Sequence, residues 1–137
     1  MKPVLLDTGP IVAMLDRSEQ RHADCAELIS QLDAPLVTCE AVLAEACYLL
    51  REVRGAAEAI LENVECGNFL VPYRLTGRAT KLARLMKKYA DQPMDFADAC
   101  LVDMAGAMGT GPRLTREGGV PFFFRGGNSP FVAFPRT

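Results

Sequence analysis

Three acidic residues stand where a buried element of the chain begins or ends. Asp7 directly follows an apolar run, Glu45 lies on the apolar stripe of an expected helix, and Asp98 shares the inward face of another. A carboxylate that faces a protein core is costly unless it is paired or binds a cation. Like charges in one pocket cannot all stay ionised unaided, and Mg²⁺ or Mn²⁺ prefers oxygen ligands. These acids therefore predict a metal site that activates water and stabilises charge building on a phosphate.

Each acid also has a plainer structural interpretation. Asp7 suits a turn or a helix cap, and Glu45 could form a salt bridge with an arginine further along its helix. Asp95 needs no purpose beyond that of an N-cap, and Asp98 could interact with the helix dipole in the first turn. The functional interpretation is favoured for Glu45 and Asp98, because their apolar neighbours place both on inward faces.

The elements that must position these acids alternate between apolar runs and helical stripes. The run 3–6 is apolar at successive positions, which is typical of a parallel strand buried on both faces. Asp7 then stands at the carboxyl end of that strand, where open α/β sheets bind ligands. Further strands are expected at 36–37, 69–71, 113–115 and 131–134. Helices are expected over 11–16, after a Ser18 cap, after a Thr38 cap, over 57–64, after a Thr76 cap, and from about 94.

This alternation predicts one α/β domain over residues 1–137. Its three layers would contain a short, mostly parallel sheet of four or five strands flanked by helices. No apolar run approaches the roughly 20 residues that span a bilayer, and the opening residues do not form a signal peptide. We therefore expect a cytoplasmic protein.

Charge and cysteine content narrow the classes of partner. The chain has 15 Lys and Arg against 17 Asp and Glu, so any nucleic-acid binding must come from a local patch. The strongest candidate patch is on the expected fifth helix, and phosphate contact there is a minority hypothesis. It comprises Arg78, Lys81, Arg84, Lys87 and Lys88.

The five cysteines and single histidine give little support for a zinc site. None of the cysteines forms a C-x-x-C pair, so they suggest small core residues in a reducing cytosol. A nucleophilic Cys–His pair that uses His22 stays open, although no spacing favours it. His22 itself falls on a helical face, which favours a partly buried structural residue.

Three short motifs in this order resemble the PIN-domain family and, within it, the VapC-like toxins of bacterial and archaeal toxin–antitoxin pairs. They are Leu-Leu-Asp-Thr at 5–8, Ala-Glu-Ala at 44–46 and Asp-Phe-Ala-Asp-Ala at 95–99. Their spacing agrees with the family from Val4 to about Thr115. Each motif alone is weak, but the set together with the α/β alternation is fairly specific.

The resemblance implies a ribonuclease that uses Mg²⁺ or Mn²⁺ to cleave RNA phosphodiesters. Asp7, Glu45 and Asp98 would be the catalytic and metal-binding acids, with Asp95 as an accessory ligand and Thr8 beside them. The resemblance also implies a cognate antitoxin protein as partner and a homodimer.

The last family motif differs in this chain. The family usually follows its fourth strand with Thr-x-Asp and a further Asp-Phe, whereas this chain has Thr115 and then Glu117, with no acid at the second position. Glu117 is one methylene longer and could still reach a metal. The difference predicts reduced activity and an atypical fold after about residue 115. It also leaves open a catalytically weakened PIN-like domain that binds RNA or protein without cutting.

A rival enzyme class comes from Asp-Thr-Gly at 7–9, which looks like the motif of aspartic proteases. There the aspartate works as half of a dyad. Those proteins are nearly all β, whereas this chain has mostly helical patterns, so the protease interpretation is improbable.

Overall fold

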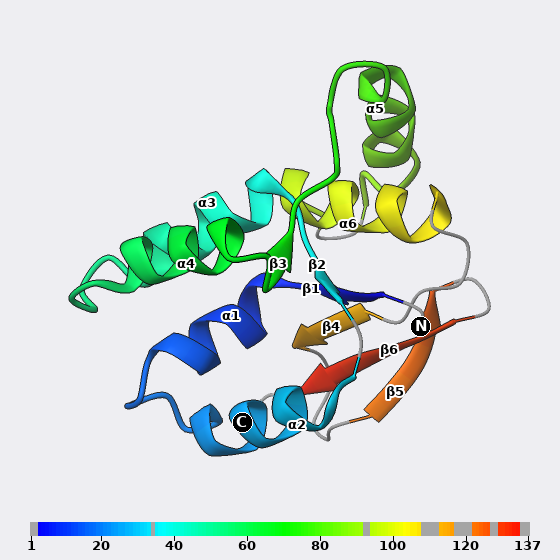
Figure 1. Cartoon of the computed structure of the whole chain (residues 1–137). Coiled ribbons are helices and arrows are strands. Elements are labelled where there is room, and N and C mark those ends of the chain that lie inside the picture. Colours follow the sequence, from blue (N-terminus) through cyan, green and yellow to red (C-terminus); the bar gives the residue numbers. More distant parts are fainter. Residues whose placement is uncertain are drawn as a thin grey trace.

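The computed structural model describes residues 3–33, 35–91, 94–107, 113–116, 122–126 and 129–134, with side-chain detail as far as residue 107. Helices and strands alternate through most of this length (Figure 1). The strands are β1 (Val4–Leu6), β2 (Leu36–Val37), β3 (Phe69–Leu70), β4 (Arg113–Arg116), β5 (Phe122–Gly126) and β6 (Ser129–Phe134). The helices are α1 (Thr8–Leu15), α2 (His22–Gln31), α3 (Glu40–Leu49), α4 (Ala56–Glu65), α5 (Ala79–Lys88) and α6 (Phe96–Ala107).

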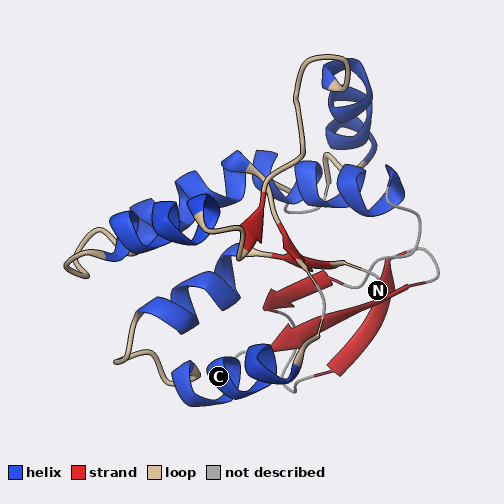
Figure 2. Cartoon of the chain, viewed as in Figure 1, coloured by secondary structure: helices blue, strands red, loops and turns tan. Residues whose placement is uncertain are grey.

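The described strands form one sheet in the order β3-β2-β1-β4-β6-β5. Every neighbouring pair is parallel except β5 and β6, which form an antiparallel edge. Helices α1 and α2 lie on one side of the sheet, and α3, α4 and α6 lie on the other (Figure 2). The mostly parallel α/β sandwich is therefore confirmed. With six strands, the sheet exceeds the expected four or five, because β5 was not predicted.

Strand β1 is the centre of the core. Leu5 and Leu6 are completely buried, as the unbroken apolar run predicts. Val4 and Leu5 pair with β2, while Leu5 and Leu6 pair with β4. Parallel pairing on both sides brings the carboxyl ends of these strands to one edge of the sheet, and α1 begins directly after β1 at that edge.

The three expected helix caps, Ser18, Thr38 and Thr76, are wrong because each of these helices begins later. Residue Arg21 precedes α2, Cys39 precedes α3 and Arg78 precedes α5. Thr38 is fully buried and donates a hydrogen bond to the Leu6 carbonyl oxygen at 2.9 Å, which ties the end of β2 to the end of β1. A tertiary contact has therefore replaced the local one that the sequence favoured.

The ends of α3 and α4 show a second departure from the expected pattern. The helical spacing of Val42, Ala46 and Leu49 predicts a buried stripe on α3, but Leu49 is 52% exposed at the end of that helix. Gly55 separates α3 from α4 with a φ of 78°, a left-handed conformation that glycine adopts without strain. Gly67, at a φ of 86°, follows α4 in the same way, as expected. None of the described helices is long and apolar enough to cross a bilayer.

A buried ion pair fastens α5 to α6. The Arg78 guanidinium donates from Nε to one Asp103 carboxylate oxygen at 2.9 Å and from a terminal nitrogen to the other at 2.6 Å. The Tyr73 hydroxyl adds a third bond to the same carboxylate at 2.8 Å. This bidentate contact with Arg78 holds the pKa of Asp103 below its usual range. Helix α5 is thus held by Arg78, which belongs to the basic patch predicted on the expected fifth helix.

Breaking this contact should destabilise the fold in a pH-dependent way. We expect Arg78→Met to lower the urea midpoint several times more than Lys87→Met, an exposed neighbour on α5, because Asp103 would stay buried without its countercharge. Tyr73→Phe should cost about 1 kcal/mol. Since the pKa of Asp103 is lowered, the contribution exists above the ordinary carboxyl range and disappears as pH falls through the lowered value. Equal midpoints for Arg78→Met and Lys87→Met at pH 7 would contradict this account.

Candidate metal centre at the carboxyl edge of the sheet

Asp7 lies between the end of β1 and the start of α1. Its carboxylate oxygen Oδ1 accepts a hydrogen bond of 2.7 Å from the Thr8 backbone N–H, so Asp7 is the N-cap of α1. The first N–H groups of a helix and its dipole both favour a negative charge at this position. The cap interpretation of Asp7 is therefore correct.

Thr8 connects this strand end to α3. Its side chain is buried and its hydroxyl donates a hydrogen bond of 2.6 Å to Glu45 Oε1. Glu45 is half-buried, as its place on the apolar stripe predicted. The alternative salt bridge with an arginine is wrong for the described residues, where Arg51 bonds the Tyr48 carbonyl oxygen and lies over its ring. The Thr8 hydroxyl therefore fixes Glu45 beside Asp7.

Asp98 stands in the first turn of α6, where it exchanges hydrogen bonds with Asp95. The Asp98 N–H donates to Asp95 Oδ1 at 2.8 Å, and the Asp95 N–H donates to Asp98 Oδ2 at 3.3 Å. This reciprocal pattern is a capping box. Asp95 is exposed and Asp98 is half-buried. Asp95 thus has the N-cap role expected from the sequence, while Asp98 faces inward.

The electrostatics of Asp98 link it to the other two acids. Burial is the largest cause that raises its pKa, to about 6, and repulsion from Asp95, Asp7 and Glu45 adds to the effect. Repulsion from Asp7 and Glu45 requires that both carboxylates lie near Asp98. Asp7 before α1, Glu45 on α3 and Asp98 on α6 therefore lie close enough for their charges to interact at the edge of the sheet.

A divalent cation fits the chemistry of this region. Carboxylate and hydroxyl oxygens are the donors that Mg²⁺ and Mn²⁺ prefer, and a cation would relieve the repulsion that raises the pKa of Asp98. In the part of the chain with side-chain detail, no three His, Cys, Asp or Glu side chains are close enough together to hold a metal ion as they stand. Binding would therefore require these side chains to move closer together.

The last predicted motif follows Leu114, at the end of β4. Glu117 lies outside the described residues, and of Thr115 only the backbone is described, within β4. Leu114 pairs with Leu6, so the register carries the chain after Leu114 to the same edge as Asp7. The roles of Thr115 and Glu117 stay predictions.

The alternative sites have less structural support. The His22 imidazole Nδ1 lies 2.8 Å from the Ala13 carbonyl oxygen, in keeping with a partly buried helix residue. Cys25, Cys39 and Cys100 are buried as expected, whereas Cys66 is exposed. The six-helix α/β architecture of the described chain is also incompatible with the nearly all-β aspartic proteases.

The parallel sheet with acids at its carboxyl edge is typical of PIN domains, and comparison with known proteins places the chain among them. The PIN-domain family model matches residues 4–111, so the chain belongs to the PIN-domain family. It is 31% identical over 116 residues to Ribonuclease VapC26 of Mycobacterium tuberculosis, covering 83% of this chain and 86% of that protein.

A solved structure agrees in fold. The crystal structure of Mycobacterium tuberculosis VapC20, described as a sarcin–ricin loop cleaving toxin, superposes with a TM-score of 0.72. The match covers 80% of this chain and 86% of that one at 18% identity. The VapC-like resemblance predicted from the three motifs is confirmed.

Replacing Asp98 should stabilise the metal-free protein. A carboxyl whose pKa is raised to about 6 in the folded state costs stability once pH exceeds the ordinary carboxyl range, and the full cost is reached above pH 6. In EDTA we therefore expect Asp98→Asn to melt higher than wild type at pH 7.5, with the difference disappearing near pH 4. Asp24→Asn, an exposed first-turn acid of α2, is the matched control. A lower melting temperature for Asp98→Asn at pH 7.5 would show that burial and repulsion of the charged Asp98 carboxylate do not cost the fold stability.

Proposed function

We propose that this protein is a metal-dependent endoribonuclease, the toxin of a toxin–antitoxin pair, which cleaves RNA phosphodiesters. The observation that carries this proposal is the arrangement of acids at the carboxyl edge of the sheet, where Asp7 caps α1 after strand β1, Thr8 bonds Glu45, and Asp98 is half-buried in the first turn of α6. Repulsion between carboxylates costs stability. A cluster of them at the ligand-binding edge of a parallel sheet therefore indicates a functional site. The similarity to VapC26, itself named a ribonuclease, supports the same activity.

Asp7 and Asp98 would be the main ligands of Mg²⁺ or Mn²⁺, with Asp95 and Glu117 as accessory acids. When bound, the cation supplies Lewis-acid stabilisation of the phosphate and lowers the pKa of a water molecule. Glu45 would orient that water and accept its proton through the oxygen that Thr8 does not hold. The capped N-terminus of α1 keeps the Asp7 carboxylate in place. Thr8 acts through Glu45 as a positioning residue.

Glu117 makes the proposed activity weaker than that of a site with the full set of aspartates. Its longer side chain holds geometry less tightly, and small misplacements at a reacting centre cost rate steeply. The second candidate function is therefore a PIN-like domain that binds RNA or a protein partner without cutting. The altered residues Glu117–Pro121 are the observation that favours it.

The proposed partners are a cognate antitoxin protein and a second copy of the chain. Apolar side chains exposed on α3 and α4 support such protein contacts, since Tyr48 and Leu61 are each 63% exposed and Leu49 is 52% exposed. We also propose that residues 1–137 form one domain and that it works in the cytoplasm, in line with its free cysteines.

Cleavage of structured RNA with Mn²⁺ tests the proposal. We expect Asp7→Asn to lower the single-turnover rate at least about a hundredfold, because it removes a metal ligand, and Asp24→Asn to leave it unchanged. Glu117→Asp should raise the rate by restoring the shorter carboxylate. Glu45→Gln should abolish cutting while RNA binding persists.

Two results would contradict parts of this account. If Asp7→Asn cuts as fast as wild type, the acids are not catalytic. If wild type binds RNA but shows no Mn²⁺-dependent cutting, the non-cutting alternative is correct. An unchanged rate for Glu117→Asp would refute the explanation of the altered motif alone.

A further inference from the structure

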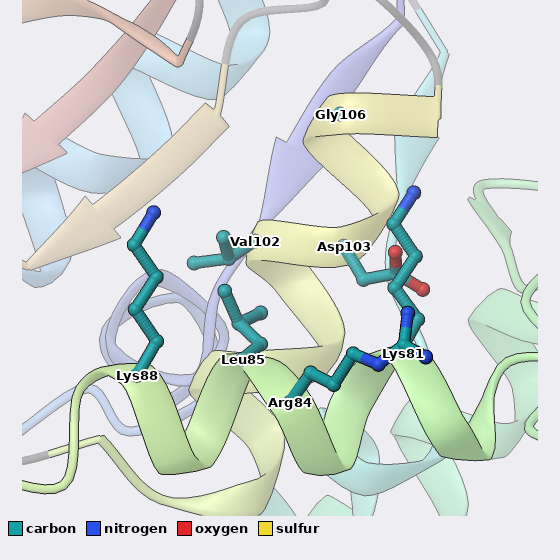
Figure 3. A pocket seen from close by; sticks show the side chains of 7 residues that line it. All are labelled: Lys81, Arg84, Leu85, Lys88, Val102, Asp103 and Gly106. Carbon is teal, nitrogen blue, oxygen red and sulfur yellow. The ribbon is translucent and has the colours of Figure 1, made fainter.

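A positively charged groove lies between α5 and α6, away from the acids. It has a volume of about 330 Å³. Leu85 and Val102 face each other across it and form an apolar floor (Figure 3). Its remaining lining residues are Lys81, Arg84, Lys88, Asp103 and Gly106. We call this feature the α5–α6 groove.

The charges of the groove are strongly unbalanced. Its one acid, Asp103, is already neutralised by Arg78 and has a side chain only 2% exposed. That contact is the one ion pair found in the part of the chain with side-chain detail. Lys81 and Arg84 form no ion pair there, although the Lys81 charge also helps to lower the pKa of Asp103. Lys88 lies over the Tyr89 ring at 5.4 Å, which leaves its charge uncompensated. The groove thus concentrates three positive charges in a chain whose formal net charge is -2.

The α5–α6 groove continues from the acidic edge along one strip of α6. Asp98, Val102 and Gly106 follow each other at four-residue steps, so they share a strip of the helix surface at intervals of about 6 Å. Asp98 and Val102 are half-buried and Gly106 is exposed, whereas Leu101 and Ala105 between them are buried. The accessible strip of α6 therefore joins the acids to the groove.

We propose that the α5–α6 groove binds the phosphodiester backbone of the RNA strand whose cleavage is proposed above. This inference rests on the proposed function. RNA is a polyanion, so the acidic edge that would cut it also repels it. Val102 and Gly106 of the groove follow Asp98 by one and two turns of α6, and the cations of α5 that line the same groove offset that repulsion. Their spacing along α5 suits successive phosphates, and the apolar floor suits the faces of sugars or bases. The groove determines how RNA enters the site, and the acids carry out the chemistry.

Binding measured without cleavage tests the groove independently. The probe is a fluorescein-labelled RNA stem-loop with a single-stranded tail, titrated with the full chain in EDTA and followed by anisotropy. The groove variant is Lys81→Gln, Arg84→Gln and Lys88→Gln combined. The control combines Arg17→Gln, Arg54→Gln and Lys87→Gln, which remove the same charge from exposed positions outside the groove.

We expect the groove variant to raise the Kd at least about tenfold relative to the control. Three lost contacts should also flatten the slope of log K against log salt by about 2, at roughly 0.7 per phosphate contact on single strands. With Mn²⁺, the groove variant should raise the KM for RNA and leave the rate at saturation unchanged. If the groove variant unfolds at a lower urea concentration than the control, the single variants Arg84→Gln and Lys87→Gln are compared instead of the two triple variants.

The outcomes separate the groove from the proposed function. Equal Kd values and slopes for groove and control variants would overturn the groove, even if wild type cleaves RNA. A groove-dependent Kd without any cleavage would refute the nuclease and keep the groove. An acidic polypeptide serves as a second probe. If the groove variant loses binding to this polypeptide but keeps its binding to RNA, the groove is a protein-docking surface and the inference is overturned.

Discussion

Repulsion between carboxylates at the carboxyl edge of the sheet is the constraint on which the site depends. Asp7 follows strand β1, while Glu45 and Asp98 lie on α3 and α6, and the charges of Asp7 and Glu45 add to the effect of burial in raising the pKa of Asp98. Left alone, such charges would turn toward solvent. The chain opposes this with short-range hydrogen bonds, from the Thr8 N–H to Asp7, from the Thr8 hydroxyl to Glu45, and between Asp95 and Asp98. Each bond fixes an acid to a rigid element next to the buried strand β1.

Helix α5 carries positive charge away from the acidic edge of the sheet. This helix stands beyond α6 on the side away from the sheet (Figure 1) and is attached through the Arg78–Asp103 ion pair. By neutralising Asp103, Arg78 removes the one acid that would otherwise weaken the positive groove. A nearly neutral chain thereby presents an acidic edge at the start of α6 and, further along α6, a groove whose cations come from α5. Net charge alone conceals this arrangement.

The sequence was informative where burial follows periodicity. The unbroken apolar run 3–6 predicted a central strand, and apolar neighbours at helical spacing predicted that Glu45 and Asp98 face inward. Contacts between distant elements could not be predicted in this way, because no local pattern records that Thr38 bonds to Leu6 or that Arg78 meets Asp103. Strand β5 was missed because its phenylalanines stand between two glycine pairs, which favour loops. The intervening Gly127-Asn128 is a hairpin signal that could have revealed it.

The central claim is that these acids bind a divalent cation together. Crystals grown in Mn²⁺ and measured at the manganese absorption edge test it directly. We predict an anomalous peak within coordination distance of Asp7 and Asp98, lost in Asp98→Asn. A peak located elsewhere, or none at millimolar Mn²⁺ in well-ordered crystals, would contradict the metal centre and the hydrolytic mechanism that depends on it.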